Sequence, residues 1–152
     1  MPSDGTPTST SSPTQQLNAL LTDLLERTPG ASRAVLVSGD GIKLSYSGMG
    51  TDDADRLAAT VSSLFLLAPQ SFPHSSGRTH QVVVEHDAGF FLVMGANNAF
   101  TDESASKTAL AVATTPAANV GQAGYEMQRF VASLEEHLVV KARANTFSGP
   151  GL

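Results

Sequence analysis

The sequence contains no cysteine among its 152 residues. Disulfides, thiolate nucleophiles, zinc ribbons and lipid anchoring through a cysteine are therefore excluded for this chain. Basic residues are also scarce, because nine Lys and Arg stand against 14 Asp and Glu and give a formal net charge of −5. The largest basic cluster is the pair Lys141 and Arg143, which is too small to attract nucleic acid or an anionic membrane surface. We therefore expect neither partner.

Long hydrophobic runs are absent as well. No apolar stretch has the length that a bilayer-spanning helix needs, so we expect no direct membrane insertion. The first fifteen residues contain no Lys, no Arg and no apolar run, and they do not have the form of a signal peptide. These features predict a cytoplasmic location, with any membrane association made through partners.

The motifs of common enzyme classes are missing too. There is no P-loop, no G-x-S-x-G elbow and no H-E-x-x-H helix, and Gly39-Asp40-Gly41 lacks the third small residue of a dinucleotide fingerprint. His80 and His86 share one face of a predicted strand, but they lie about 20 Å apart along it, too far to hold one metal ion. Adjacent carboxylates such as Asp52 and Asp53 diverge on a helix and cannot share a proton. We predict no catalytic, cofactor-binding or metal-binding residue.

The composition divides the chain into one domain and two tails. From Pro2 to Pro13 all residues but one are Pro, Ser, Thr or Gly, which predicts a disordered tail over 1–13. A hydrophobic fraction of 41% is ordinary for a globular protein, and we predict one folded domain over 14–143. Residues 144–152 have a composition like that of the first tail and are predicted to be flexible.

Periodicity and turn chemistry give the order of the elements. Ser12 to Gln15 has the S-x-x-Q form of a helix capping box, and Thr51 is predicted to cap a second helix. Asp40-Gly41 is a hairpin signal, because such turns need a positive φ that Asp tolerates and Gly adopts freely. The predicted helices cover 14–27, 51–68 and the segment from Asn119 to 143, and the predicted strands cover 34–38, 42–47, 79–86, 90–94 and 107–114. Short connections imply antiparallel neighbours, so we predict an α+β fold with the order helix, two strands, helix, three strands, helix.

Two predicted elements carry more apolar surface than one sheet can cover. In the helix over 51–68, one broad arc suits burial against a sheet, but the opposite arc is also small or apolar. The strand over 79–86 contains three consecutive valines and is too apolar to remain an open edge. The second packed face predicted here consists of Ala59, Ser62, Ser63 and Leu66 on the helix, and of Gln81, Val82, Val83 and Val84 on the strand.

Four phrases, in this order, resemble the Roadblock family of dynein light-chain-like proteins over about Leu17 to Leu138. They are LLTDLLERTPGASRAVLVSGDGIKLSYS, TDDADRLAATVSSLF, QVVVEHDAGFFLVM and NVGQAGYEMQRFVASL. The chain is most similar to the actinobacterial kind encoded beside a sensor-kinase-like protein and a small Ras-like GTPase. Two features depart from the family: the segment 96–106 is longer than the tight loop of many relatives, and His86 stands where an apolar residue is more usual.

The resemblance implies a profilin-like architecture, a five-stranded antiparallel sheet with the second helix on one face and the first and last helices on the other. It also implies a homodimer in which the third strands pair edge to edge and the second helices pack together. Such a dimer would cover the second packed face. Family members have no chemistry of their own: they are platforms for small GTPases, motors or scaffolds, and some bacterial members accelerate GTP hydrolysis.

The leading hypothesis is therefore a non-enzymatic homodimeric regulator of a small Ras-like GTPase in a bacterial signalling complex, with the sensor-kinase-like protein as a further partner. The alternative is a small-molecule sensor of profilin-like or PAS-like type, because such a sheet can also hold a ligand beneath a helix. The strands FFLVM and ALAVAT disfavour the sensor, since they indicate tight packing without a cavity. An unrecognised hydrolase is a third hypothesis, which the missing motifs disfavour.

Overall fold

The computed structural model describes residues 12–96 and 108–147, without the side chains of 135 and 137–147. Apart from Ala96, the predicted long segment 96–106 therefore lies outside the described residues, as do most of the two predicted tails. The elements are α1 (Pro13–Arg27), β1 (Ala31–Val37), β2 (Lys43–Ser47), α2 (Thr51–Leu67), the short 3-10 helix η1 (Ala68–Ser71), β3 (Gln81–His86), β4 (Gly89–Gly95), β5 (Ala109–Thr114) and α3 (Val120–Phe147). The predicted order of helices and strands is confirmed.

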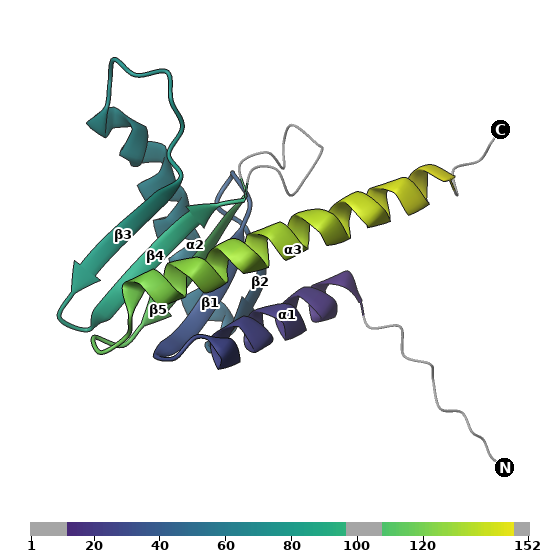
Figure 1. Ribbon diagram of the computed structural model, residues 1–152, viewed down its shortest axis with the longest axis horizontal. Coiled ribbons are helices and arrows are strands. Elements are labelled where there is room, and N and C mark those ends of the chain that lie inside the picture. Colours follow the sequence, from purple (N-terminus) through teal and green to yellow (C-terminus); the bar gives the residue numbers. More distant parts are fainter. Residues whose placement is uncertain (1–11, 97–107, 148–152) are drawn as a thin grey trace, which may run out of the picture.

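The five strands form one sheet in the order β2-β1-β5-β4-β3, and every neighbouring pair is antiparallel. Figure 1 shows α1 and α3 side by side over one face, with α2 behind the sheet. The predicted five-stranded sheet with one helix on one face and two on the other is therefore confirmed. The strands β2 and β3 are the two edges.

Alternating side chains of the central strands feed two separate cores. In β1, Leu36 points to the α1 and α3 side, whereas Val35 and Val37 point to the α2 side. The same alternation holds in β4 and β5, so the sheet is buried on both faces at its centre. The first core also contains Leu21 and Leu24 of α1 and Ala123, Met127, Phe130 and Leu134 of α3; the second contains Ala58 and Val61 of α2.

The ends of the elements match the sequence signals in part. Ser12 and Gln15 form the predicted capping box, with each side chain accepting the other residue's backbone N–H. Thr51 does not cap α2, because Gly50 occupies the cap position and Thr51 is already helical. The reversal at Asp40-Gly41 is present, but Gly41 alone has a positive φ, of 82°. The turn is therefore a three-residue loop with glycine at the left-handed position, and the positive φ predicted for Asp40 is wrong.

Candidate interaction surface

The outer edge of β3 is open. No strand within 12–96 or 108–147 pairs with it, and its pairing with β4 is regular from Gln81 to His86 without a bulge. Val83 and Val84 are 46% and 37% exposed on this edge strand. Native proteins often protect an edge with a bulge, a proline or charged side chains, and of these β3 has only one charged residue, Glu85 near its end. The strand is therefore available for pairing with another chain.

The opposite edge, β2, is closed by α1. The side-chain oxygen Oδ1 of Asn18 accepts the backbone N–H of Tyr46 at 3.2 Å and the hydroxyl of Ser45. The hydroxyls of Thr22 and Ser47 form a further hydrogen bond of 2.7 Å. A register shift in the β1–β2 ladder adds to this protection. Within the described residues, the edge of β2 is thus better protected than the edge of β3.

The two flanks of α2 differ in what they face. On one flank, Asp55 forms an ion pair with Lys43 of β2, and Ser62 lies against Gly41 in the β1–β2 turn. Since helical residues advance by about 100° each, the opposite flank carries Leu57, Thr60, Leu64 and Leu67. The strand order puts β4 and β3 on that side of the helix.

An uncovered apolar surface lies between this second flank and the edge of the sheet. Val82 and Phe91 are only half buried, and Leu57 and Leu64 of α2 are half buried as well. Leu67 is 57% exposed. We call this set, together with Val84, the α2-side surface; its members are Leu57, Leu64, Leu67, Val82, Val84 and Phe91. It is contiguous with the open edge of β3.

The helix residues predicted for the second packed face do not share one environment. Ser62 is half buried against the β1–β2 turn. Ser63 and Ala59 are exposed, and the Ser63 hydroxyl donates to the Ala59 carbonyl oxygen at 2.9 Å. Leu66 is 74% exposed. The four strand residues Gln81, Val82, Val83 and Val84 lie together in β3. Leu67, which the sequence prediction does not include, lies on the flank of α2 that the strand order places toward β4 and β3.

The segment that links α2 to β3 creates two hollows. Figure 1 shows η1 and the following loop rising beyond the sheet before the chain returns to β3. One hollow, of about 410 Å³, is lined by Val61, Phe65, Leu66 and Arg78, among others. The second, of about 570 Å³, lies between Phe72 and the start of β3. Both are open surface features and not enclosed cavities within a core.

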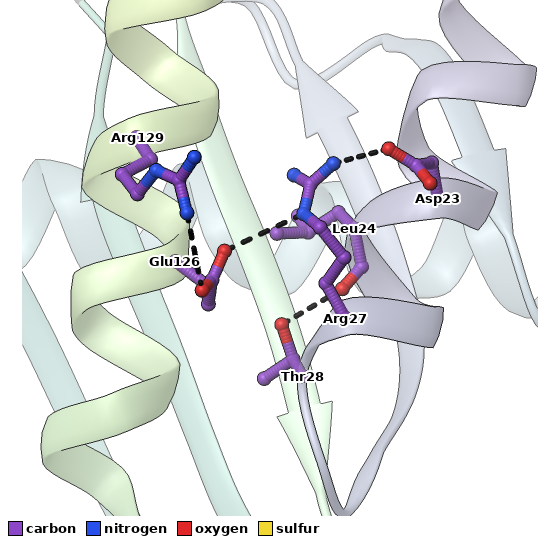
Figure 2. Close-up of polar contacts among 6 residues, drawn as sticks. All are labelled: Asp23, Leu24, Arg27, Thr28, Glu126 and Arg129. Carbon is purple, nitrogen blue, oxygen red and sulfur yellow. Dashed lines mark hydrogen bonds and ion pairs between the residues drawn. The ribbon is translucent and has the colours of Figure 1, made fainter.

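A polar cluster joins α1 to α3 on the other side of the sheet (Figure 2). Glu126 is 9% exposed, and its Oε2 lies 3.4 Å from Nε of Arg27, while Oε1 lies 3.6 Å from a guanidinium nitrogen of Arg129. Arg27 also pairs with Asp23, and the buried Thr28 hydroxyl donates to the Leu24 carbonyl oxygen at 2.7 Å. The cluster contains no histidine, its carboxylates face arginines and its one hydroxyl donates to a backbone carbonyl, so its geometry is that of a polar link between two helices.

The described part of the chain offers neither a metal site nor a membrane-spanning helix. Among the side chains that the structure describes, no group of three or more His, Cys, Asp or Glu is arranged to hold a metal ion. No helix in the same ranges is long and apolar enough to cross a bilayer. His86 has a local role instead, because its Nδ1 accepts the backbone N–H of Ala88 at 2.9 Å in the β3–β4 turn.

Comparisons with known proteins agree with this architecture. The family model of the Roadblock/LC7 domain matches residues 17–101. A Roadblock/LC7 domain from Streptomyces avermitilis is 33% identical, with a TM-score of 0.70 over 80% of this chain and 97% of that one. No curated protein matches the chain.

Two more distant structures share the fold alone. The gliding protein MglB from Thermus thermophilus is 19% identical, with a TM-score of 0.66 over 83% of this chain and 90% of that one. Profilin IA from Acanthamoeba castellanii is 13% identical, with a TM-score of 0.52 over 79% and 97%. The family match and the Streptomyces domain together confirm the resemblance read from the sequence. The chain therefore belongs to the Roadblock/LC7 family, whose domains are generally regulatory and non-enzymatic.

Proposed function

We propose that this chain is a non-enzymatic, homodimeric regulator that binds a small Ras-like GTPase in a bacterial signalling complex and promotes its GTP hydrolysis. Membership of the Roadblock/LC7 family supports a regulatory role based on protein contacts. The sequence resemblance suggests a small Ras-like GTPase as one partner and a sensor-kinase-like protein as a further partner. Contacts with both would take place in the cytoplasm.

The open, apolar edge of β3 is the observation that carries the homodimer. A second copy supplies an identical edge, so pairing of the two strands satisfies the outward backbone groups of both at once. The α2-side surface continues from this edge, and a second copy joined at β3 brings its own α2-side surface to the same face of the extended sheet. Burial of Val84 and Leu67 in this way adds the hydrophobic term that backbone pairing alone lacks.

The proposed interface keeps the strand residues of the sequence prediction and changes the helix residues. Gln81, Val82, Val83 and Val84 remain in it. On α2, we place Leu64 and Leu67 nearer the two-fold axis than Ser62 and Leu66, because Ser62 lies against the β1–β2 turn on the opposite flank. Ala59 and Ser63 lie on the outward side of the helix and are left for a further partner.

The direct test of the proposal measures assembly and GTPase binding in one series. Light scattering at micromolar concentration should give the mass of a dimer. The dimer, immobilised, should then retain a purified Ras-like GTPase of the same bacterium, and single-turnover hydrolysis by that GTPase should accelerate when the dimer is added. A monomeric mass, or a dimer that retains the GTPase in neither its GTP-bound nor its GDP-bound form, would contradict the proposal.

A matched pair of variants separates assembly from folding. Val83→Lys adds a charge at the open edge and should give a folded monomer that no longer accelerates hydrolysis. Glu26→Lys introduces the same side chain, with an even larger change in charge, on the exposed side of α1, away from β3, and should leave both mass and activity unchanged. Equal losses in the two variants would mean that added positive charge, and not the β3 edge, is responsible.

The hollow of about 410 Å³ favours the small-molecule sensor as a second candidate function. Its lining combines apolar side chains of α2, such as Val61 and Phe65, with the cationic Arg78. A sensor should copurify with a metabolite, which native mass spectrometry would detect as a mass increment. Arg78→Ala should remove that increment if the hollow is the ligand site.

A further inference from the structure

The backbone of β3 presents only alternate residues to its open edge. The N–H of Gly95 donates to the carbonyl oxygen of His80 at 3.2 Å, so His80 and Gly95 form a hydrogen-bonded pair of the β3–β4 ladder. Hydrogen-bonded pairs alternate in an antiparallel ladder. The N–H and C=O groups that point away from β4 are therefore those of Gln81, Val83 and Glu85.

Two-fold symmetry limits how two β3 strands can pair. This step depends on the proposed function, since it takes the second copy as the occupant of the edge. A two-fold axis normal to the sheet leaves every side chain on the same face in both copies, and residues opposed in a ladder also share a face. One residue must then oppose itself across the axis. Within the valine run, the candidates are Val82, Val83 and Val84.

The three registers differ in the side chains that they oppose. With Val82 on the axis, Gln81 opposes Val83 of the partner subunit and His80 opposes its Val84. With Val84 on the axis, Val83 opposes the carboxylate of Glu85 of the partner subunit. With Val83 on the axis, Val82 opposes Val84 of the partner subunit, and Gln81 opposes its Glu85. Only this last register pairs apolar with apolar side chains and an amide donor with a carboxylate.

The Val83 register also uses every outward backbone group of the strand. The backbone groups of Gln81 form hydrogen bonds with those of Glu85 of the partner subunit. The backbone groups of Val83 form them with Val83 of the partner subunit. A shift of the axis to Val82 leaves Glu85 opposite Thr79, outside the strand, and a shift to Val84 leaves Gln81 opposite Asp87, beyond the strand's other end. We propose that the second copy joins at β3 with Val83 on the two-fold axis, in the register that opposes Gln81 to Glu85 and Val82 to Val84.

The charges at the two ends of β3 agree with antiparallel pairing. Arg78 precedes the strand, whereas Glu85 and Asp87 lie at its end, and all three are exposed. Antiparallel pairing brings the cationic start of one copy near the acidic end of the other, at both ends of the junction. Parallel pairing would bring like charges together, which is destabilising. The distribution of charge along β3 thus favours antiparallel pairing, which is the orientation that two-fold symmetry requires.

The two faces of the joined sheet would differ at the junction. Val82 and Val84 point to the α2 side, because their partners in β4 are Val93 and Phe91 of the second core. Gln81 points to the α3 side, where its Nε2 lies 3.8 Å from the position of a Cβ on Gly124. The junction is therefore apolar beneath the two α2 helices and polar beside the two α3 helices.

Single-cysteine variants test the register, since the chain has no cysteine of its own. Opposed residues in a hydrogen-bonded pair have Cα atoms about 5.5 Å apart, within the range that a disulfide spans. Under mild oxidation, Val83→Cys should give a covalent dimer on non-reducing electrophoresis. Val82→Cys and Val84→Cys should not do so alone, because their like residues lie about 8 Å apart or more, but an equimolar mixture of the two should. Glu26→Cys on α1 is the exposed control and should stay uncrosslinked.

Each other pattern overturns the register in a recognisable way. Fast crosslinking of Val82→Cys or Val84→Cys alone, with none at Val83→Cys, would move the axis while leaving the β3 dimer in place. A dimer by light scattering with no crosslink at any of the three positions would exclude β3 as the interface. A monomer by light scattering would overturn the proposed homodimer itself.

A charge exchange gives a second readout that needs no oxidation. Gln81→Lys should lower the dissociation constant of the dimer about three- to tenfold, because each dimer contains two pairs of residue 81 with Glu85 of the partner subunit. Gln81→Glu should raise the dissociation constant by a similar factor. Equal dissociation constants for the two variants would contradict the opposition of Gln81 and Glu85.

Discussion

Gly89 has a backbone conformation and a close contact that no other type of amino acid would tolerate at this position. Its φ is +141°, and a Cβ built on it would lie 1.8 Å from the carbonyl oxygen of Thr114. That oxygen belongs to the backbone of β5 and cannot move away without breaking the ladder. Because Gly89 has no side chain, the start of β4 can lie this close to the end of β5.

Gly89→Ala should destabilise the fold by about 2–4 kcal/mol, because both the positive φ and the backbone contact oppose a side chain. Gly50→Ala is the matched control: no atom lies within 4 Å of its Cβ position, and its φ is −81°. We expect a cost below about 1 kcal/mol there. Denaturant unfolding of the two variants measures the difference, and equal midpoints would contradict this account.

The ion pairs of Glu126 contribute less to the stability of the fold than Gly89 does, and the contribution depends on how far each pair is buried. The Arg27 side chain is 39% exposed and the Glu126 side chain 11% exposed, so solvent screens the pair only in part. In a double-mutant cycle of Arg27→Met and Glu126→Gln, we expect a coupling of about 0.5–1 kcal/mol. The Arg129 side chain is 60% exposed, and its coupling to Glu126 should be smaller. A larger coupling for Arg129 than for Arg27 would contradict this assignment.

At the scale of elements, local signals were sufficient for α1 and insufficient for α2. The capping box at Ser12 and Gln15 depends on residues of the helix end itself, so the sequence alone predicts it. The flank of α2 that faces the open edge depends on the contacts of Asp55 with Lys43 and of Ser62 with Gly41, which only the folded chain brings together. Periodicity showed that α2 has two apolar sides but could not orient the second.

Leu66 and Leu67 distinguish the α2 interface predicted from the sequence from the one proposed on the structure. If the proposed dimer forms, Leu67→Arg should weaken it at least tenfold, because the flank of Leu67 faces β3 and β4, whereas Leu66→Arg should change the dissociation constant less than about threefold. Both side chains are exposed in the single chain, at 57% and 74%, so neither change should lower the stability of the subunit strongly. Sedimentation equilibrium measures the two constants. The reverse order would restore the interface that the sequence predicted.

At the scale of the whole molecule, the sheet order could be predicted only through the family resemblance. Hairpin-length links identify β1–β2 and β3–β4 as neighbours, but the central position of β5 requires that β1 and β4 accept it from both sides. Nothing in the spacing of residues 31–114 states this. Likewise, the closure of β2 by Asn18 depends on where α1 packs, although the apolar β3 already indicated an unprotected edge.

The proposed association through the edge of β3 should couple assembly to the stability of the fold. If the dimer dissociates as the chains unfold, mass action raises the melting temperature with concentration, by about 1–3 °C for each tenfold increase at this chain length. The Val83→Lys variant should have the same melting temperature at every concentration, because unfolding of a monomer does not change the number of molecules. Circular dichroism melts at 2, 20 and about 200 μM would measure both slopes. A flat wild-type profile, together with a dimeric mass throughout, would mean that the subunits stay joined after the fold is lost, which a strand-edge junction cannot do.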